Sequence, residues 1–231
     1  MSRIKVILWD IDGTLLNFKE AEEYAIKACF SQFDIGLCSE EMLAEYSLIN
    51  QSYWQQLERG EITKKQVFEG RFHEFFTNHQ IDTSIIPMFN QEFQIQLGNT
   101  VRFNDNSYEL VMTLRDKVKQ YAVTNGSKIA QKRKLAKSGL AEIFDDIFIS
   151  EEVGIEKPMP GFFDAVWNQI GNYQKNEVMI VGDSLTSDMQ GGNNAGILCC
   201  WYNPQKTPNT SNLKIDYEIT SLTQIPDLIT G

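Results

Sequence analysis

The sequence has few of the residues from which disulfide-linked scaffolds and histidine-based metal centres are built. Its 231 residues include four cysteines, none in a CxxC pattern, and two isolated histidines. This composition argues against a disulfide framework and against a metal site built on histidine. Cys199 and Cys200 stand together in an apolar run, which predicts that both are buried in a strand. Reduced cysteines suit the cytoplasm, which is the location that we expect.

The sequence also lacks long apolar runs and an excess of positive charge. No apolar stretch approaches the about 18 residues of a transmembrane helix, and the N-terminus shows no signal-peptide pattern. Acidic residues outnumber basic ones by 31 to 21, which gives a net charge of −10. Such a surface repels polyanions, so neither a nucleic-acid polymer nor a membrane is an expected partner. A small phosphorylated molecule is compatible, because a metal ion and a lysine can reverse the field locally.

The apolar patterns divide the chain into two parts. Residues 4–9 form an apolar run rich in β-branched residues, which predicts a buried strand. Residues 17–98 show helical periodicity in four segments, whereas after residue 98 short apolar runs alternate with helical patterns. We therefore predict an α/β fold with a doubly wound parallel, Rossmann-like sheet and an inserted four-helix subdomain. The sheet part comprises residues 1–16 and 99–231, and the helical insertion comprises residues 17–98.

The second part of the chain contains further candidate elements. Strands are predicted at residues 121–124, 147–149, 178–181, 197–201 and 217–219. Helices are predicted at residues 128–138, 160–170 and 185–194.

Two aspartates follow the first predicted strand. Asp10 and Asp12 come directly after it, and Gly13 permits a sharp turn. Carboxylates at the end of a buried strand are costly unless a metal ion or a reacting group uses them. A calcium-binding loop is excluded, because its sixth and twelfth positions, counted from Asp10, are Leu15 and Ala21 instead of Gly and Glu. The pair therefore indicates a metal-binding or phosphoryl-transfer site.

Other polar residues are predicted near the same edge of the sheet, where open parallel sheets bind their ligands. Thr124 and Asn125 follow the second strand of the chain, and Asp183 and Asp188 follow residues 178–181. Lys157 lies in a loop before the helix at residue 160. Each residue alone has a simple explanation as a cap, a turn or a solvated side chain. Their order and their shared placement favour one common site.

The run Asp10-Ile11-Asp12-Gly13-Thr14 resembles the first motif of the haloacid dehalogenase (HAD) superfamily of phosphohydrolases. Thr124, Lys157 and the pair Asp183 and Asp188 are similar to the three later motifs, in the same order, so the resemblance covers the whole chain. It implies that the helical insertion is a cap. It also implies that Asp10 is a nucleophile that forms an aspartyl-phosphate.

The resemblance further implies a Mg²⁺ site and a phosphate site. Asp10, the backbone carbonyl of Asp12, and Asp183 would bind Mg²⁺, with Asp188 holding a metal-bound water or Lys157. Thr124, Asn125 and Lys157 would hold the phosphoryl group, and Lys157 would also pair with Asp10. Asp12 would be the general acid and base, which a halide leaving group does not require. Its presence therefore argues for phosphate ester hydrolysis over dehalogenation.

A finer resemblance concerns the helical insertion. Residues 49–63 and the run Gly70-Arg71-Phe72, together with residues 139–145 and 150–154, are similar to the YjjG-type pyrimidine 5′-nucleotidases. This resemblance implies hydrolysis of nucleoside monophosphates such as UMP, dUMP or dTMP.

A nucleobase needs an apolar slot with an aromatic wall. Phe18 lies just after Asp12, and Asn50 and Trp54 are four residues apart on one helical face, so these three side chains are candidates to bind the base. The competing interpretation is that the aromatic residues belong to the core and that Arg71 is only a surface residue.

Alternatives remain open at this point. The substrate is a small phosphate ester in every enzymatic interpretation, and a sugar-phosphate phosphatase, a phosphoglycolate phosphatase and a phosphomutase all share the same motifs. A non-catalytic binding domain on this fold is a further alternative, because fold does not fix function. The intact set of acidic and lysine residues argues against it. We expect a monomer or a homodimer.

Overall fold

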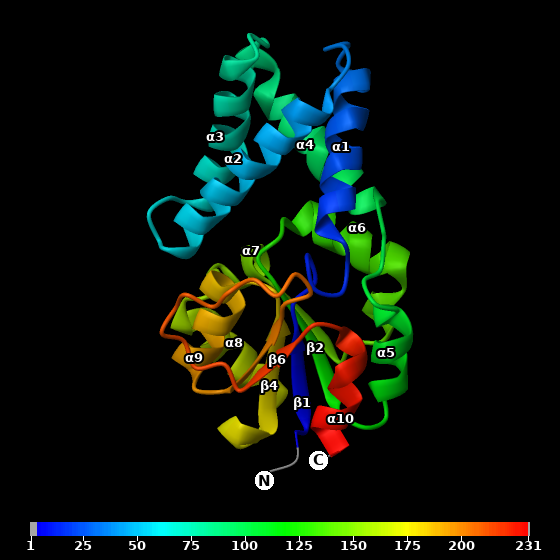
Figure 1. The fold of residues 1–231 in the computed structure, drawn as a ribbon, viewed down its shortest axis with the longest axis vertical. Coiled ribbons are helices and arrows are strands. Elements are labelled where there is room, and N and C mark those ends of the chain that lie inside the picture. The colour runs from blue at the N-terminus through cyan, green and yellow to red at the C-terminus, as the bar shows by residue number, and fades with distance from the viewer. Residues whose placement is uncertain (1–3, 231) are drawn as a thin grey trace.

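A six-stranded parallel sheet forms the lower part of the molecule in the computed structural model, which describes residues 4–230 (Figure 1). Its strand order is β3-β2-β1-β4-β5-β6, and every neighbouring pair is parallel. The strands are β1 (Val6–Trp9), β2 (Lys119–Thr124), β3 (Asp146–Ile149), β4 (Val178–Gly182), β5 (Leu198–Tyr202) and β6 (Tyr217–Ile219). Strand β1 lies in the middle of the sheet, so its carboxyl end adjoins those of β2 and β4.

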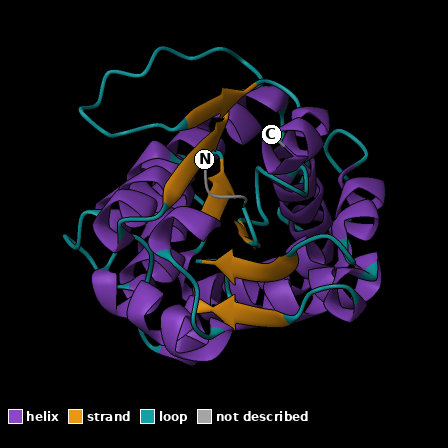
Figure 2. Ribbon diagram, turned by 90° about the horizontal axis from the view of Figure 1, so that it is seen from below, coloured by secondary structure: helices purple, strands orange, loops and turns teal. Residues whose placement is uncertain are grey.

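Helices cover both faces of this sheet (Figure 2). The alternation of side chains along β1 explains this, because Ile7 and Trp9 face one apolar cluster whereas Val6 and Leu8 face the other. Strands buried on both faces read as continuous apolar runs. The first face packs against α5 (Ser107–Leu114), α6 (Lys128–Ser138) and α10 (Ile225–Thr230). The second packs against α8 (Pro160–Ile170) and α9 (Gln190–Ala195).

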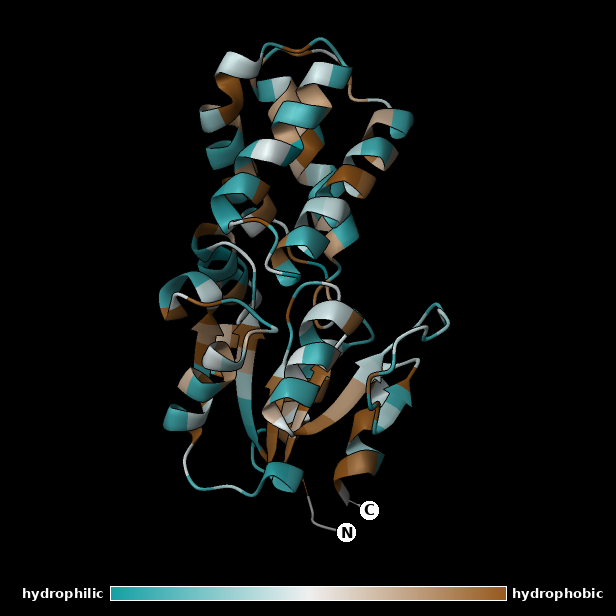
Figure 3. Cartoon of the chain, turned by 90° about the vertical axis from the view of Figure 1, so that its left-hand side faces the viewer, coloured by the Kyte–Doolittle hydropathy of each residue, from teal (hydrophilic) through white to brown (hydrophobic). Residues whose placement is uncertain are grey.

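Four helices inserted between β1 and β2 stand above the sheet, and we call them the helical unit (Figure 1). They are α1 (Phe18–Gln32), α2 (Glu40–Glu58), α3 (Lys64–Asn78) and α4 (Ile86–Asn99). Their apolar sides meet in a cluster that also includes Ala130 from the sheet part, and in it Phe72 contacts Phe89 and Phe93 with ring centroids 5.0 and 5.3 Å apart. Hydrophilic residues colour much of the outer surface of these helices (Figure 3).

The observed elements agree with the predicted fold class and lie close to the predicted boundaries. The helices at 128–138 and 160–170 have the predicted ends, and each predicted strand is present within about two residues. The predicted helix at 185–194 differs, because it begins with a π-helical turn at Leu185–Met189 before α9 starts. Helices α5 and α10 were not predicted. The division at residues 16/17 and 98/99 remains a prediction, although the unit has its own apolar cluster.

The predicted burial of Cys199 and Cys200 is confirmed, and both lie in β5 as free cysteines. Within residues 4–230, no helix combines the length and the apolar character that crossing a membrane requires.

Candidate active site

A cavity of about 150 Å³ lies between the carboxyl ends of the strands and the helical unit. It brings together residues that are far apart in the sequence. Of the predicted site residues, all except Asn50 line it. The residues that line it include Asp10, Asp12, Phe18, Trp54, Glu58, Arg71, Gln94, Leu97, Thr124, Asn125, Gln131, Lys157, Asp183 and Asp188.

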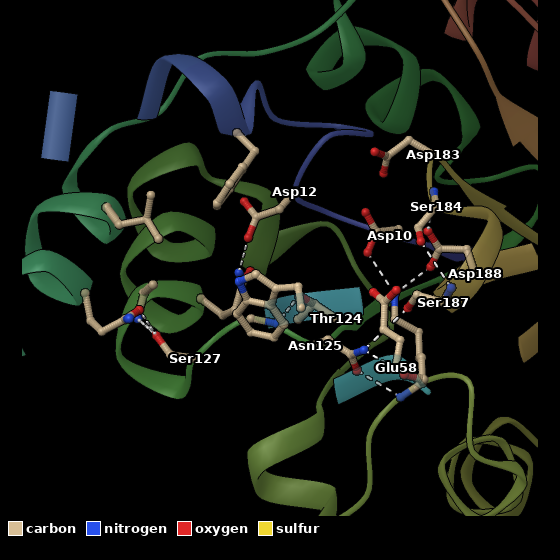
Figure 4. Close-up of a pocket in the computed structure, with 18 of the residues that line it drawn as sticks. Asp10, Asp12, Glu58, Thr124, Asn125, Ser127, Asp183, Ser184, Ser187 and Asp188 are labelled. Atoms are coloured by element: carbon tan, nitrogen blue, oxygen red, sulfur yellow. Dashed lines mark hydrogen bonds and ion pairs between the residues drawn. The ribbon is translucent and has the colours of Figure 1, made fainter. Parts of the chain in front are cut away.

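Three carboxylates gather on the sheet side of the cavity (Figure 4). Asp10, Asp183 and Asp188 each offer an oxygen, and these oxygens all lie within 4.8 Å of one another. Glycines make this approach possible. A Cβ atom on Gly13 would lie 2.5 Å from Asp183 Oδ2, and one on Gly182 would lie 2.3 Å from Asp188 Cγ. Hard oxygen ligands at this spacing fit a divalent cation such as Mg²⁺.

The side chain of Lys157 contacts two of the three acids. Its Nζ donates to Asp10 Oδ1 at 2.8 Å, to Asp188 Oδ1 at 2.7 Å and to the carbonyl of Val123 at 2.8 Å. Burial lowers the pKa of Lys157, but the two carboxylates outweigh it and hold the pKa above its ordinary value. The lysine is therefore a fixed positive charge next to the acids.

Asn125 fixes the loop that carries this lysine. Its Nδ2 donates to the Lys157 carbonyl at 2.8 Å, and its Oδ1 accepts from the Lys157 backbone N–H at 2.9 Å. Thr124 is buried at the end of β2, and its Oγ1 accepts from the backbone N–H of Gly126 at 3.0 Å. Both residues thus hold backbone in place at the cavity wall. Whether they also contact a phosphoryl group remains a prediction.

Crowding of acids in an enclosed place disfavours their charged forms. Burial and the neighbouring Asp188 raise the pKa of Asp10 well above its ordinary value, although Lys157 opposes the shift. Asp183 is exposed to the solvent of the cavity but surrounded by protein atoms, and burial together with Asp188 raises its pKa to about 7. The Thr14 hydroxyl lies 3.1 Å from Asp10 Oδ2 and 3.1 Å from Asp183 Oδ1, between the two acids. A bound cation would favour the charged forms.

The side chain of Asp12 points away from these three carboxylates (Figure 4). Its Oδ2 accepts from Gln131 Nε2 at 2.6 Å, and its Oδ1 is bonded to the buried ammonium of Lys134. The predicted part of Asp12 in the metal site was its backbone carbonyl, and that assignment remains a prediction. Its side chain is separate from the metal cluster, at the cavity wall formed by α6.

The helical unit supplies the opposite wall. Phe18 from the start of α1 and Trp54 from α2 line the cavity with Leu97 from α4, and both rings are partly accessible. Both rings therefore lie at the cavity surface, which weakens the competing interpretation that they are ordinary core residues. Their contact with substrate remains a prediction.

The structure places Asn50 behind this wall, away from the cavity. Its Nδ2 donates to Glu22 Oε1 at 2.7 Å, and its Oδ1 accepts from Arg71 Nη1 at 2.8 Å. Because both ends of the amide are occupied and the residue is 2% exposed, the predicted contact of Asn50 with substrate is not supported. The interpretation of Arg71 as a surface residue is wrong, since Arg71 is 1% exposed and lines the cavity.

Four functional candidates were not identified from the sequence: Glu58, Arg71, Gln131 and Lys134. Glu58 bridges the two walls, because its carboxylate accepts from the Thr186 hydroxyl, and burial raises its pKa to about 7. Gln131 and Lys134 lie three residues apart on α6, so their spacing on one helical face was a usable signal. The sequence contains no comparable signal to show which faces of α2 and α3 point toward the sheet.

Comparisons with known proteins agree with this geometry. Residues 4–196 match the family of haloacid dehalogenase-like hydrolases. The chain is 34% identical to the HAD-hydrolase YfnB of Bacillus subtilis over 97% of this chain and 95% of that protein. It is 33% identical to the pyrimidine 5′-nucleotidase PynA of Streptococcus pneumoniae (97% and 94% covered) and 28% identical to the pyrimidine 5′-nucleotidase YjjG of Escherichia coli (96% of each).

A solved structure is similar throughout its length. The crystal structure of YfnB bound to magnesium matches with a TM-score of 0.92 at 32% identity, over 100% of both chains. The strand order, the acidic cluster at the strand ends and these matches lead to one conclusion. The chain is an enzyme that belongs to the haloacid dehalogenase-like hydrolases.

Proposed function

We propose that this hydrolase is a Mg²⁺-dependent phosphatase that acts on pyrimidine nucleoside monophosphates such as UMP, dUMP and dTMP. The observation that carries the proposal is the pairing of two walls in one cavity. Asp10, Asp183 and Asp188 converge on the sheet side, and Phe18 and Trp54 lie on the opposite side. The first wall suits a phosphate with a metal ion, and the second suits a flat base.

The chemistry assigned to the sheet side is a double displacement. A carboxylate oxygen of Asp10 bonds to phosphorus as the ester P–O bond breaks, and the leaving oxygen takes a proton from Asp12. Water then attacks phosphorus, gives its proton to Asp12 and releases phosphate and free Asp10. Lys157 holds Asp10 in place at 2.8 Å and adds positive charge beside the phosphoryl group.

Magnesium would be held by the acidic cluster, where it offsets the repulsion between the Asp10 carboxylate and a dianionic ester. Asp183 and the backbone carbonyl of Asp12 are its assigned partners beside Asp10. The magnesium in the YfnB crystal structure supports this assignment, because that chain matches this one over its whole length.

The substrate assignment depends on the relatives and on the aromatic wall. PynA and YjjG are both pyrimidine 5′-nucleotidases, and each matches at least 96% of this chain. The partly exposed rings of Phe18 and Trp54 on the helical wall give a base a surface on which to stack. We propose that single-ring bases are preferred to purines, because both relatives are pyrimidine 5′-nucleotidases.

The helical unit acts as a cap in this proposal. The cavity of about 150 Å³ is smaller than the about 300–1,000 Å³ of small-molecule sites, so the unit must move to admit a nucleotide. Asn17, the N-cap of α1, and Gly98, near the end of α4, are the proposed hinges. Interdomain movement in the YfnB crystal structures supports such a motion.

A phosphate-release screen with Mg²⁺ tests the proposal. UMP, dUMP and dTMP are compared with AMP, GMP, glucose 6-phosphate, phosphoglycolate and p-nitrophenyl phosphate, each with and without excess chelator. We expect the pyrimidine nucleotides to have the highest kcat/KM and the chelator to abolish turnover. Preference for phosphoglycolate or a hexose phosphate would reject the substrate assignment, and full activity in chelator would reject the metal site. No turnover of any ester would favour a binding domain.

A further inference from the structure

Buried polar atoms without a partner mark places where a ligand can complete the hydrogen bonding. Within residues 4–230, three buried side-chain atoms have none: Tyr46 Oη, Arg71 Nε and Gln131 Oε1. Arg71 and Gln131 line the same cavity, one from the helical unit and one from the sheet part. One atom is a donor and the other an acceptor. Both residues therefore border the space between the two walls, although the two atoms themselves are shielded in this structure.

The guanidinium of Arg71 is held in one orientation. Its Nη1 donates to Asn50 Oδ1 at 2.8 Å, and its Nη2 donates to Asn90 Oδ1 at 3.1 Å. The rings of Phe72 and Phe93 lie 4.8 and 5.0 Å from its central carbon. Both terminal nitrogens are thus engaged by neutral amides, and Nε is the nitrogen left with no partner. The donor is fixed in place before any ligand arrives.

The guanidinium of Arg71 also lacks a direct ion pair. In the described part of the chain, no carboxylate lies within ion-pair distance of it. Glu22 reaches it only through Asn50, whose Nδ2 donates to Glu22 Oε1 at 2.7 Å. A buried cation without a direct ion pair favours an oxygen acceptor that carries partial or full negative charge.

Gln131 is a less useful residue to test, although its orientation is equally fixed. A carboxylate only accepts, so the bond of 2.6 Å to Asp12 Oδ2 must come from Nε2, which leaves Oε1 free. Any change at Gln131 would disturb Asp12 as well. Arg71 has no contact with the catalytic acids, so changes at Arg71 separate recognition from chemistry.

We propose that Arg71 is a specificity-determining residue whose Nε–H donates to a carbonyl oxygen of the pyrimidine base. The inference rests on the proposed nucleotidase function and assigns the recognition of the leaving group to one donor. Uracil and thymine carry only two exocyclic oxygens, O2 and O4, and both are acceptors. Phe18 and Trp54 on the same wall favour a base over a small carboxylate as the acceptor. Opening of the helical unit would let the base reach Nε, which is shielded here.

The test compares substrates that differ by one oxygen. The values of kcat/KM are measured for UMP, for the pyrimidin-2-one ribonucleotide that lacks O4, for the pyrimidin-4-one ribonucleotide that lacks O2, and for p-nitrophenyl phosphate. With the unchanged enzyme, we expect one of the two analogues to be at least tenfold poorer than UMP. In Arg71→Met that difference should fall below threefold, while p-nitrophenyl phosphate changes less than twofold.

Controls keep recognition apart from folding. Arg59→Met removes an exposed arginine that pairs with Glu61 at 2.6 Å and lies outside the cavity, so it should behave as the unchanged enzyme does. Melting temperatures show whether each variant folds. If Arg71→Met does not fold, Arg71→Lys replaces it. The comparison of UMP with its two analogues needs no variant at all.

Three outcomes would overturn the inference, and they affect different parts of it. If UMP is preferred to p-nitrophenyl phosphate but equals both analogues, the nucleotidase proposal stands and the role of Arg71 falls. Equal losses of kcat/KM on UMP and p-nitrophenyl phosphate in a folded Arg71 variant would likewise show that Arg71 has only a structural role. If phosphoglycolate is preferred to every nucleotide, the nucleotidase proposal falls, and the base carbonyl falls with it.

Discussion

The two walls of the cavity are built in different ways. On the sheet side, polar groups from different parts of the chain are bonded to one another, as when Lys157 joins Asp10, Asp188 and the carbonyl of Val123. On the helical side, the surface is formed by two rings, an aliphatic side chain and the polar side chains of Glu58, Arg71 and Gln94. The first wall is a connected network in which each part depends on the others. The second is a surface whose parts can change one at a time.

The walls also differ in what holds them. Parallel pairing places Trp9 beside Ala122 and Val181, which aligns the strand ends that carry the acids. The helical unit has its own aromatic cluster, and polar contacts across the gap include Glu58 with Thr186 and Lys64 with Ser150. We therefore propose that the unit shifts as a body while the sheet side stays intact. In this proposal, reaction and substrate choice reside in separately adjustable parts.

The largest expected effect is at the sheet side. Asp10→Asn should lower turnover on every substrate by several orders of magnitude, because an amide is neither a nucleophile nor an anionic metal ligand. Steady-state kinetics on UMP and p-nitrophenyl phosphate measure the loss, and circular dichroism verifies the fold. Asp116→Asn, on an exposed carboxylate, is the matched control. A folded Asp10 variant with more than about a tenth of the original rate would reject the covalent mechanism.

An intermediate and selective effect is expected at the helical side. Phe18→Ala or Trp54→Ala should lower kcat/KM for UMP or dTMP roughly tenfold or more, since stacking on a base is worth about 1–3 kcal/mol. A small phosphate ester without a base should be almost unaffected. Phe33→Ala is the control, because Phe33 lies in the helical unit against Phe89, with ring centroids 5.4 Å apart, and outside the cavity. Equal losses on substrates with and without a base would contradict the separation of the two walls.

The smallest expected effect concerns the contact between the walls. Burial raises the pKa of Glu58 to about 7 from an ordinary value of 4.5. The folded protein therefore keeps a proton that the unfolded chain releases, and stability falls as pH rises from about 4.5 to 7. Glu58→Gln cannot titrate and should lack this part of the fall. The free energy of unfolding is measured in urea without metal for both proteins. The difference between the unchanged protein and Glu58→Gln should change by on the order of 1–2 kcal/mol across that pH window. If the free energies of unfolding of the two proteins change with pH in parallel, the raised pKa of Glu58 is refuted.

The sheet side was predictable because the end of a buried strand can be recognised in the sequence. An apolar run stops where the strand stops, so Asp10, Thr124 and Asp183 could be placed at one edge from the sequence pattern alone. Parallel topology then brings those ends together. Lys157 was harder, since it lies in a loop, and its assignment came from a resemblance to a family.

The helical side was not predictable in the same way, because helical periodicity gives a buried face but not what that face meets. Asn50 and Arg71 lie on different helices, and only their packing turns one toward the other and Arg71 toward the cavity. The short helices α5 and α10 were missed for a related reason. With 8 and 6 residues, they contain too few turns for a periodic signal.

The position of β1 in the sheet has a consequence for how the chain folds. Val6 pairs with both Lys119 and Val178, so β1 has no partner until residues 119–124, about halfway along the sequence, have been made. The intervening helices have local contacts and an apolar cluster of their own, which favours their early formation. Once formed, they bring residues 17 and 102 close together, as the bond from the Asn17 N–H to the Arg102 carbonyl at 2.8 Å indicates. The insertion thus shortens the loop that β1 must close to meet β2.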